Sequence, residues 1–268
     1  MKDCCHQVLV RRLFSNMKVA MKDRIYPELD VLLARLIPSE DPNLVRCDRN
    51  SDIPFSIVVT KQPPNEAFLR RLSIQIEMRF EDLCLVFDKP IADSALRCDE
   101  AASRQLPQLV RKALSLSCPD QDRLRDYYQS LPDLSRTIRP RTPRPYEQYP
   151  PGFGSLLVRM LALRNLDWVS GSQVMCRMSG VCLSASTIGA IGRGDRELDS
   201  ELLNGFATVF GTPIRVLGEL FGITEVDVSR DRVSRAQSYV AELIWNVRHM
   251  TSDQIVDISR LATTLNDA

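Results

Sequence analysis

The sequence is short of long apolar runs, histidines and net charge, and each shortage excludes a class of protein. The longest apolar runs, 56–59 and 83–87, are far shorter than the roughly 20 residues that cross a bilayer. With two histidines and no nucleophile elbow, Walker loop or paired-carboxylate motif, hydrolytic chemistry has little support. A net charge of +1 excludes a uniformly basic nucleic-acid binder. We therefore expect no membrane span, no enzymatic activity, no cofactor and no metal.

The eight cysteines form no C-x-x-C pair, so they give no sign of a zinc site or a redox motif. Charged residues interrupt residues 1–20, and we expect no secretory signal peptide there. We therefore predict a cytoplasmic protein with free, mostly buried thiols. Cys176 and Cys182 flank a predicted turn, and they could approach each other there as a redox switch. Buried free thiols are the interpretation that we prefer at this pair.

A length of 268 residues has room for one large domain or two modest ones. Six prolines fall in residues 132–152, and proline is incompatible with a helix interior or a central strand. We therefore predict an extended Pro/Arg-rich linker over 132–152, which divides the chain into an N-terminal domain, 1–131, and a C-terminal part.

The N-terminal domain gives mixed patterns. Helical periodicity covers 28–37, and a β-branched run over 55–60 is typical of a strand. Residues 65–81 are ambiguous, because they begin like a helix and then alternate like a half-buried strand. We predict a buried strand over 83–87 and helices over 100–116 and 120–130. Together these elements fit a small α+β domain of unknown role.

Helical periodicity is sharp in residues 153–223. It predicts helices that begin near Phe153 and Trp168, a third that opens at Ser184 and ends at Gly194, and two more over 200–210 and 213–220. Ser184 is a good N-cap, since its hydroxyl can accept an unpaired N–H of the helix it opens. Gly194 suits the left-handed conformation at a helix end. By helical spacing, the core contains Val174, Ile188, Ile191, Leu203 and Phe206.

One motif runs through the third of these helices. It consists of Leu183, Ser184, Ala185, Ser186, Thr187, Ile188, Ile191, Arg193 and Gly194, followed by Leu202, Leu203, Ala207 and Gly211. This pattern resembles the phage Cro and repressor family of helix-turn-helix regulators, also called the xenobiotic-response-element family, and especially its actinobacterial members. The resemblance covers 153–223. It implies a mainly α fold with a five-helix, lambda-repressor-like DNA-binding domain whose third helix enters the major groove.

The resemblance also implies a set of DNA-contacting residues: Ser184, Ala185, Ser186, Thr187 and Gly189 on the third helix, with Arg193 and Arg196 beside its end. This helix departs from the family pattern because it lacks the Gln, Asn or Arg that make bidentate base contacts. Specificity would therefore depend on DNA shape or on water. The turn over 179–182 is also about three residues longer than the family's tight Gly turn, which would shift the angle of the third helix.

The concentrated positive charge lies on the predicted linker. Residues 153–222 hold six arginines and six acids, whereas 136–164 hold six arginines and one acid. An extended basic arm can follow the DNA backbone or enter the minor groove. We therefore predict that Arg139, Arg141 and Arg144 supply much of the affinity for double-stranded DNA; a solvated linker without a binding role is the alternative.

Residues 224–268 form a predicted tail of two amphipathic helices, over 229–250 and 253–265. The tail could pack on the DNA-binding domain or pair with a second chain. Proteins of this resemblance bind two-fold operators as dimers, and we predict a homodimer with the tail as its interface.

The sequence thus predicts a bacterial, cytoplasmic, sequence-selective transcriptional regulator, associated with the nucleoid when bound, whose N-terminal domain receives an unidentified effector or protein partner. One alternative is a protein-interaction module, antitoxin-like or adaptor-like, that keeps the helix-turn-helix scaffold with a weakened DNA face. Another is an enzyme within 1–131, which a deep pocket with convergent polar groups would support.

Overall fold

The computed structural model describes residues 65–91, 98–134, 149, 152–223 and 233–267. Within these ranges the chain forms eleven α-helices and no strand, which confirms the mainly α prediction. The helix predicted over 28–37 and the strand predicted over 55–60 lie outside the described residues.

The described residues before 92 are helical where a strand was predicted. Helix α5 (Glu66–Gln75) begins at Asn65, whose side chain accepts the Phe68 N–H. It buries Leu69 and Leu72 on one face and leaves Ile74 79% exposed, so the alternating pattern is not that of a strand. The strand predicted over 83–87 is wrong, because 83–86 belong to α6 (Phe80–Val86) and Phe87 is the C-cap of that helix. A short, wholly buried apolar run has no periodicity that separates a strand from a helix.

Two helices follow in the predicted places. Helix α8 (Glu100–Ala113) is capped by the Asp99 carboxylate, which accepts the Ala101 N–H at 2.9 Å. Helix α9 (Cys118–Ser130) is capped by Ser117. The described stretches of 65–131 are therefore helical, and they give no support to a mixed α+β fold.

Five helices occupy 153–221 at the predicted positions: α10 (Phe153–Leu163), α11 (Trp168–Ser179), α12 (Ala185–Arg193), α13 (Ser200–Phe210) and α14 (Ile214–Phe221). Helices α11 to α14 each end at a glycine in the left-handed conformation, which a residue with a Cβ adopts only at a cost. The five core residues predicted in this segment are all fully buried.

The tail forms α15 (Arg235–Val247) and α16 (Ser252–Asn266), with capping boxes at Ser234 and Thr251. Both helices turn their apolar faces onto the same chain. Helix α15 packs against α8, α9 and α13, and α16 packs against α8 and α9. The tail was predicted either to pack on the DNA-binding domain or to pair with a second chain. Packing within the chain is what buries these apolar faces.

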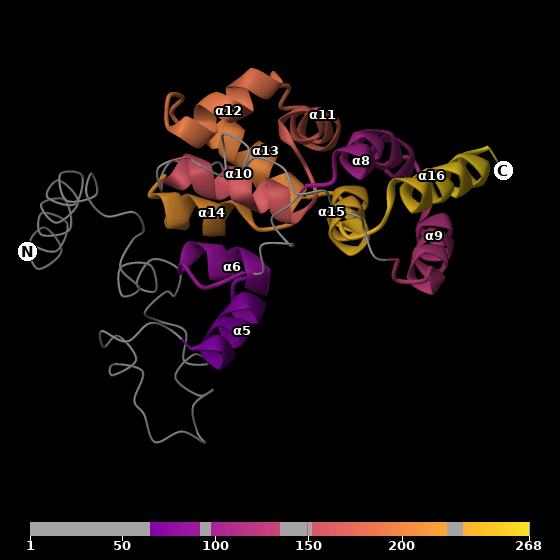
Figure 1. Cartoon of the computed structure of the whole chain (residues 1–268), viewed down its shortest axis with the longest axis horizontal. Helices are drawn as coiled ribbons and strands as arrows, with labels where there is room; N and C mark the ends of the chain where they lie inside the picture. Colours follow the sequence, from indigo (N-terminus) through magenta and orange to yellow (C-terminus); the bar gives the residue numbers. More distant parts are fainter. Residues whose placement is uncertain (1–64, 92–97, 135–148, 150–151, 224–232, 268) are drawn as a thin grey trace, which may run out of the picture.

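The helices on the two sides of the predicted linker share one hydrophobic core. Figure 1 shows α15 between the α10–α14 group and the layer of α8, α9 and α16; α6 packs against α10, and α5 packs against α6. A buried ion pair crosses from α6 to the end of α10: the Arg164 guanidinium donates to both Asp82 carboxylate oxygens, at 2.9 and 2.6 Å. The described part of 1–131 is thus packed directly onto the five-helix segment.

Candidate nucleic-acid interface

A cluster of hydroxyl groups opens α12. The Ser184 hydroxyl accepts the Thr187 N–H at 3.1 Å, as the N-cap prediction required. It also hydrogen bonds to the hydroxyls of Ser186, at 2.7 Å, and Thr187, at 2.9 Å. Ser184 and Ser186 are exposed, while Ala185 and Thr187 are half-buried. The first turn of α12 therefore presents small hydrogen-bonding groups and free backbone N–H groups to the surroundings, a combination that suits an anion.

The back of α12 packs tightly against two elements. Gly189, predicted to face outward, is instead buried, and a Cβ there would lie 3.1 Å from the Trp168 ring. Trp168 is therefore a packing residue that covers this position. Gly154 on α10 lies so close to the Ile191 carbonyl that a Cβ would collide with it. Glycines at these contacts let α12 lie directly on α10 and α11.

The two arginines beside the end of α12 are paired with neighbouring carboxylates. Arg193 Nε lies 2.6 Å from Asp195, and an Arg196 Nη lies 3.7 Å from Asp199. The hydrogen bond to Asp195 is the main reason that the pKa of Arg193 is raised. The Arg193 and Arg196 side chains are 46% and 56% exposed, so these ion pairs are weak and open to exchange with a phosphate.

The remaining predicted contact residues, Arg139, Arg141 and Arg144, lie outside the described residues. Tyr149 is described, and its ring packs on Gly192 of α12. Burial raises the pKa of the Tyr149 hydroxyl. Tyr149 therefore lies against the C-terminal half of α12.

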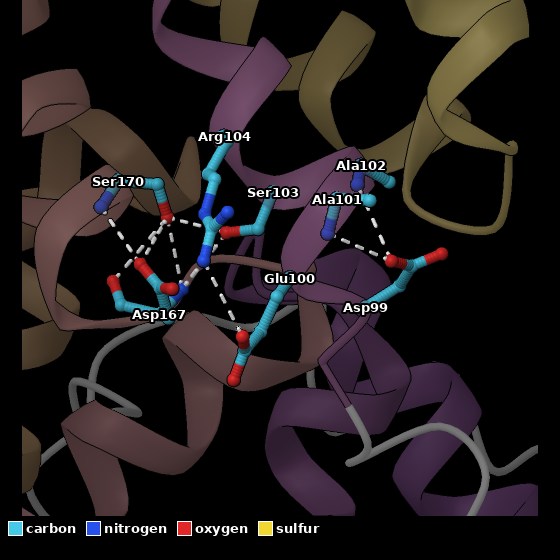
Figure 2. Close-up of polar contacts among 8 residues, drawn as sticks. All are labelled: Asp99, Glu100, Ala101, Ala102, Ser103, Arg104, Asp167 and Ser170. Atoms are coloured by element: carbon cyan, nitrogen blue, oxygen red, sulfur yellow. Dashed lines mark hydrogen bonds and ion pairs between the residues drawn. The ribbon is translucent and has the colours of Figure 1, made fainter. Parts of the chain in front are cut away.

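Sequence reasoning missed the bracing of α11 by α8. Figure 2 shows the N-termini of these helices side by side. The Ser103 and Ser170 hydroxyls share a buried hydrogen bond of 2.6 Å, and the Asp167 N–H donates to Ser103 at 3.3 Å. The Asn165 side chain accepts the Asp99 N–H at 2.7 Å. The capping pattern from Asp167 to Ser170 is readable in the sequence, but its partner on α8 is not, because it is 64 residues away.

The structure corrects the prediction for the two cysteines that flank the turn between α11 and α12. Cys176 and Cys182, which we expected to be free thiols, form a disulfide with Cα atoms 4.3 Å apart. The pairing is possible because Gly180 ends α11 in the left-handed conformation and turns the chain back over the last turn of the helix. The disulfide joins α11 to the second residue before the N-cap of α12.

Among the described residues no group of three or more His, Cys, Asp or Glu side chains could hold a metal ion. In the same ranges every helix is too short or too polar to cross a bilayer. In comparisons with known proteins, no family model, no curated protein and no solved structure matched the chain.

Proposed function

We propose that the chain is a sequence-selective DNA-binding regulator that uses α11, the turn and α12 as a helix-turn-helix, within a lambda-repressor-like domain over 153–223. The observation that carries the proposal is the N-terminus of α12. Its exposed hydroxyl cluster, centred on Ser184 and Ser186, stands on a helix held firmly from behind by α10 and α11. A recognition helix needs this combination of small polar groups in front and rigid support behind.

The DNA contacts in this proposal divide into two kinds. Ser184, Ala185, Ser186 and Thr187 meet the major groove, where hydroxyls reach base edges or phosphates and the Ala185 methyl can contact thymine. The phosphate contacts come from Arg193, Arg196 and the basic arm with Arg139, Arg141 and Arg144. Gly189 is not among the proposed DNA contacts, because it is buried.

A protein-interaction module is the second candidate, and one observation favours it. The two arginines beside α12 are already paired with Asp195 and Asp199, and Val169 at the start of α11 is 53% exposed. A partially neutralised surface with an exposed aliphatic side chain also suits a protein partner.

Selection of bound duplexes from a random pool, with the full chain, separates the two candidates. We expect enrichment of a common sequence, and binding whose affinity falls linearly on a log–log plot against salt concentration. Recovery of unenriched sequences, with no salt-dependent binding, would contradict DNA recognition and favour the protein-interaction module.

We propose that the regulator acts as a homodimer on a two-fold operator. Because the apolar faces of α15 and α16 are covered within the chain, the dimer contact would use other surfaces of the tail. Analytical ultracentrifugation with and without the selected duplex tests this; one chain per duplex across the concentration range would contradict it.

A further inference from the structure

The Cys176–Cys182 disulfide closes the turn that leads into α12. Cys176 lies in the last turn of α11, and Cys182 lies two residues before Ser184, the N-cap of α12. Neither cysteine is among the DNA contacts proposed above. The disulfide is therefore a feature of the turn that the proposed function leaves without a task.

The disulfide can be reached from solution. Cys182 is exposed and Cys176 is half-buried, whereas the free thiols of Cys84 and Cys98 are buried. A thiolate in solution can attack an exposed disulfide, and exposed disulfides are the labile or regulatory ones in proteins. This bond can therefore be opened from the surface, without unfolding of the core.

The first part of the turn is held by other bonds. Gln237 of α15 donates to the Met178 carbonyl at 2.6 Å. Val181 is a core residue, 6% exposed, and its N–H donates to the Ser179 hydroxyl at 3.2 Å. These contacts do not involve sulfur, so residues 178–181 stay in place when the disulfide opens.

The last part of the turn depends on the disulfide. Neither Cys182 nor Leu183 makes a backbone hydrogen bond to a described residue, and the Leu183 side chain is only half-buried against the core. The next residue is Ser184, whose hydroxyl accepts the Thr187 N–H and begins α12. Opening of the disulfide would therefore free the backbone immediately before the hydroxyl cluster of α12.

Thiol–disulfide exchange at this pair has two steps. The thiolate of a low-molecular-weight thiol attacks the Cys182 sulfur, so a new S–S bond forms while the bond to Cys176 breaks. Cys176 leaves as a thiolate and takes a proton from water. A second thiolate then attacks the small thiol's sulfur in this mixed disulfide and releases Cys182, which is protonated in turn. The pair gains two electrons, and two small thiols are oxidised to one disulfide; the reverse reaction closes the pair again.

We propose that Cys176 and Cys182 are a thiol-exchange site that switches α12 between two states. The closed form holds the start of α12 in place, whereas the open form must order the backbone at Cys182 and Leu183 when DNA binds. Ordering about one backbone residue is worth on the order of tenfold in affinity, so the reduced form should bind DNA about tenfold more weakly. The exchange depends on the cysteines alone, and only its effect on DNA rests on the proposed function.

Equilibration of the full chain with a series of ratios of reduced to oxidised glutathione tests the exchange. Alkylation followed by peptide mass spectrometry measures the oxidised fraction of the pair, which should pass from disulfide to dithiol within the series. On reduction, amide hydrogen exchange at Thr187 and Ile188, whose N–H groups bond to Ser184, should accelerate about tenfold, and that of α10 should not change. A pair that keeps one state throughout, or exchange at Thr187 and Ile188 that reduction leaves unchanged, would overturn the proposal.

Fluorescence anisotropy with the selected duplex measures the consequence for DNA. The oxidised chain should bind about tenfold more tightly than the reduced chain, and the Cys176→Ser, Cys182→Ser double variant should bind like the reduced chain at every glutathione ratio. Cys118→Ser is the matched control, because it removes an exposed free thiol of α9 and should keep the full response.

The two proposals fail in different ways. Circular dichroism shows whether the double variant is folded, and the reduced wild type supplies the same comparison if it is not. Equal affinities of the oxidised and reduced chains would overturn the switch and leave DNA binding intact. Absence of binding by both forms would contradict the proposed function, and the hydrogen exchange at Thr187 and Ile188 would then decide the switch.

Discussion

Arg164 is the largest fully buried side chain of the described residues, and one carboxylate neutralises it. Its guanidinium binds both oxygens of Asp82, donates to the carbonyls of Met160 and Phe210, and lies 4.4 Å from the Phe210 ring centre. Such a network is tolerated in a core only because every strong donor is satisfied, apart from the Nε of Arg164. The pair also joins α6 to the five-helix segment.

Replacement of Asp82 by Asn should destabilise the fold by about 3–5 kcal/mol, because a buried guanidinium then lacks its counter-charge. Urea denaturation followed by circular dichroism measures the change. Glu66→Gln is the control, since Glu66 forms an exposed pair with Arg70 that is worth at most about 1 kcal/mol. The double replacement Asp82→Leu with Arg164→Met should recover much of the lost stability. Equal effects of Asp82→Asn and Glu66→Gln would show that the buried pair is not important to the fold.

Ser186 allows DNA contact and folding to be separated. It is exposed at the second position of α12, where a carboxylate interacts favourably with the helix dipole but repels phosphate. We expect Ser186→Asp to leave thermal stability unchanged or slightly higher and to weaken DNA binding at least tenfold in a fluorescence anisotropy titration. Ala67→Asp adds the same charge at the same position of α5, and should leave DNA binding intact. Equal binding by the two variants would remove α12 from the interface.

At the scale of elements, the pair α11 and α12 is fixed by three local devices. The Asp167–Ser170 capping box begins α11, left-handed Gly180 ends it, and Ser184 begins α12. The Cys176–Cys182 disulfide is a fourth link, across the turn. A cross-link over so few residues acts mainly by limiting the unfolded chain, and it also restrains the angle at which α12 leaves the turn.

Loss of this disulfide should lower stability by about 2 kcal/mol, the entropic contribution of a short closed loop. Thermal denaturation of the Cys176→Ser, Cys182→Ser double variant, against the oxidised wild type, measures the difference. Reductant should lower the melting temperature of the wild type and leave that of the double variant unchanged. Alkylation of Cys176 and Cys182 in the oxidised protein before reduction would show that the pair is not formed.

At the scale of the whole molecule, the predicted linker does not separate two independent cores. Residues of α8 contact α11, α15 and α16, so the N-terminal part covers both the five-helix segment and the tail. The hydrogen bond from Gln254 to the Pro132 carbonyl, 2.8 Å long, holds the start of the linker against α16. A displacement of α8 would therefore also displace α11, because the two helices are in contact.

The basic arm provides a prediction at this scale. If Arg139, Arg141 and Arg144 bind phosphates, their replacement by Ala should weaken binding to all duplexes alike. It should also reduce the slope of log affinity against log salt by about 0.9 for each phosphate that is no longer neutralised. Titrations at several salt concentrations measure the slope, and Arg104→Ala, an exposed arginine of α8, is the control. An unchanged slope would leave the arm as a solvated linker.

The sequence by itself determined the elements whose signals are local. Helical periodicity, Ser184 as a cap and glycine ends located helices in 153–223, and the last helix begins at the predicted place, capped by Thr251. The first tail helix, predicted over 229–250, is the shorter α15, capped by Ser234. Each of these features depends on residues within one or two turns of each other, so no knowledge of distant contacts was needed. Ser184 as the N-cap of α12 was predicted for the same reason.

Only the tertiary structure decided what depends on distant partners. The run over 83–87 became a helix because α6 is buried against α10, and Gly189 turned inward because Trp168 covers it. The Arg164–Asp82 pair and the Ser103–Ser170 contact join residues far apart in the chain. Packing and burial set these features, and neither is encoded in a window of neighbouring residues.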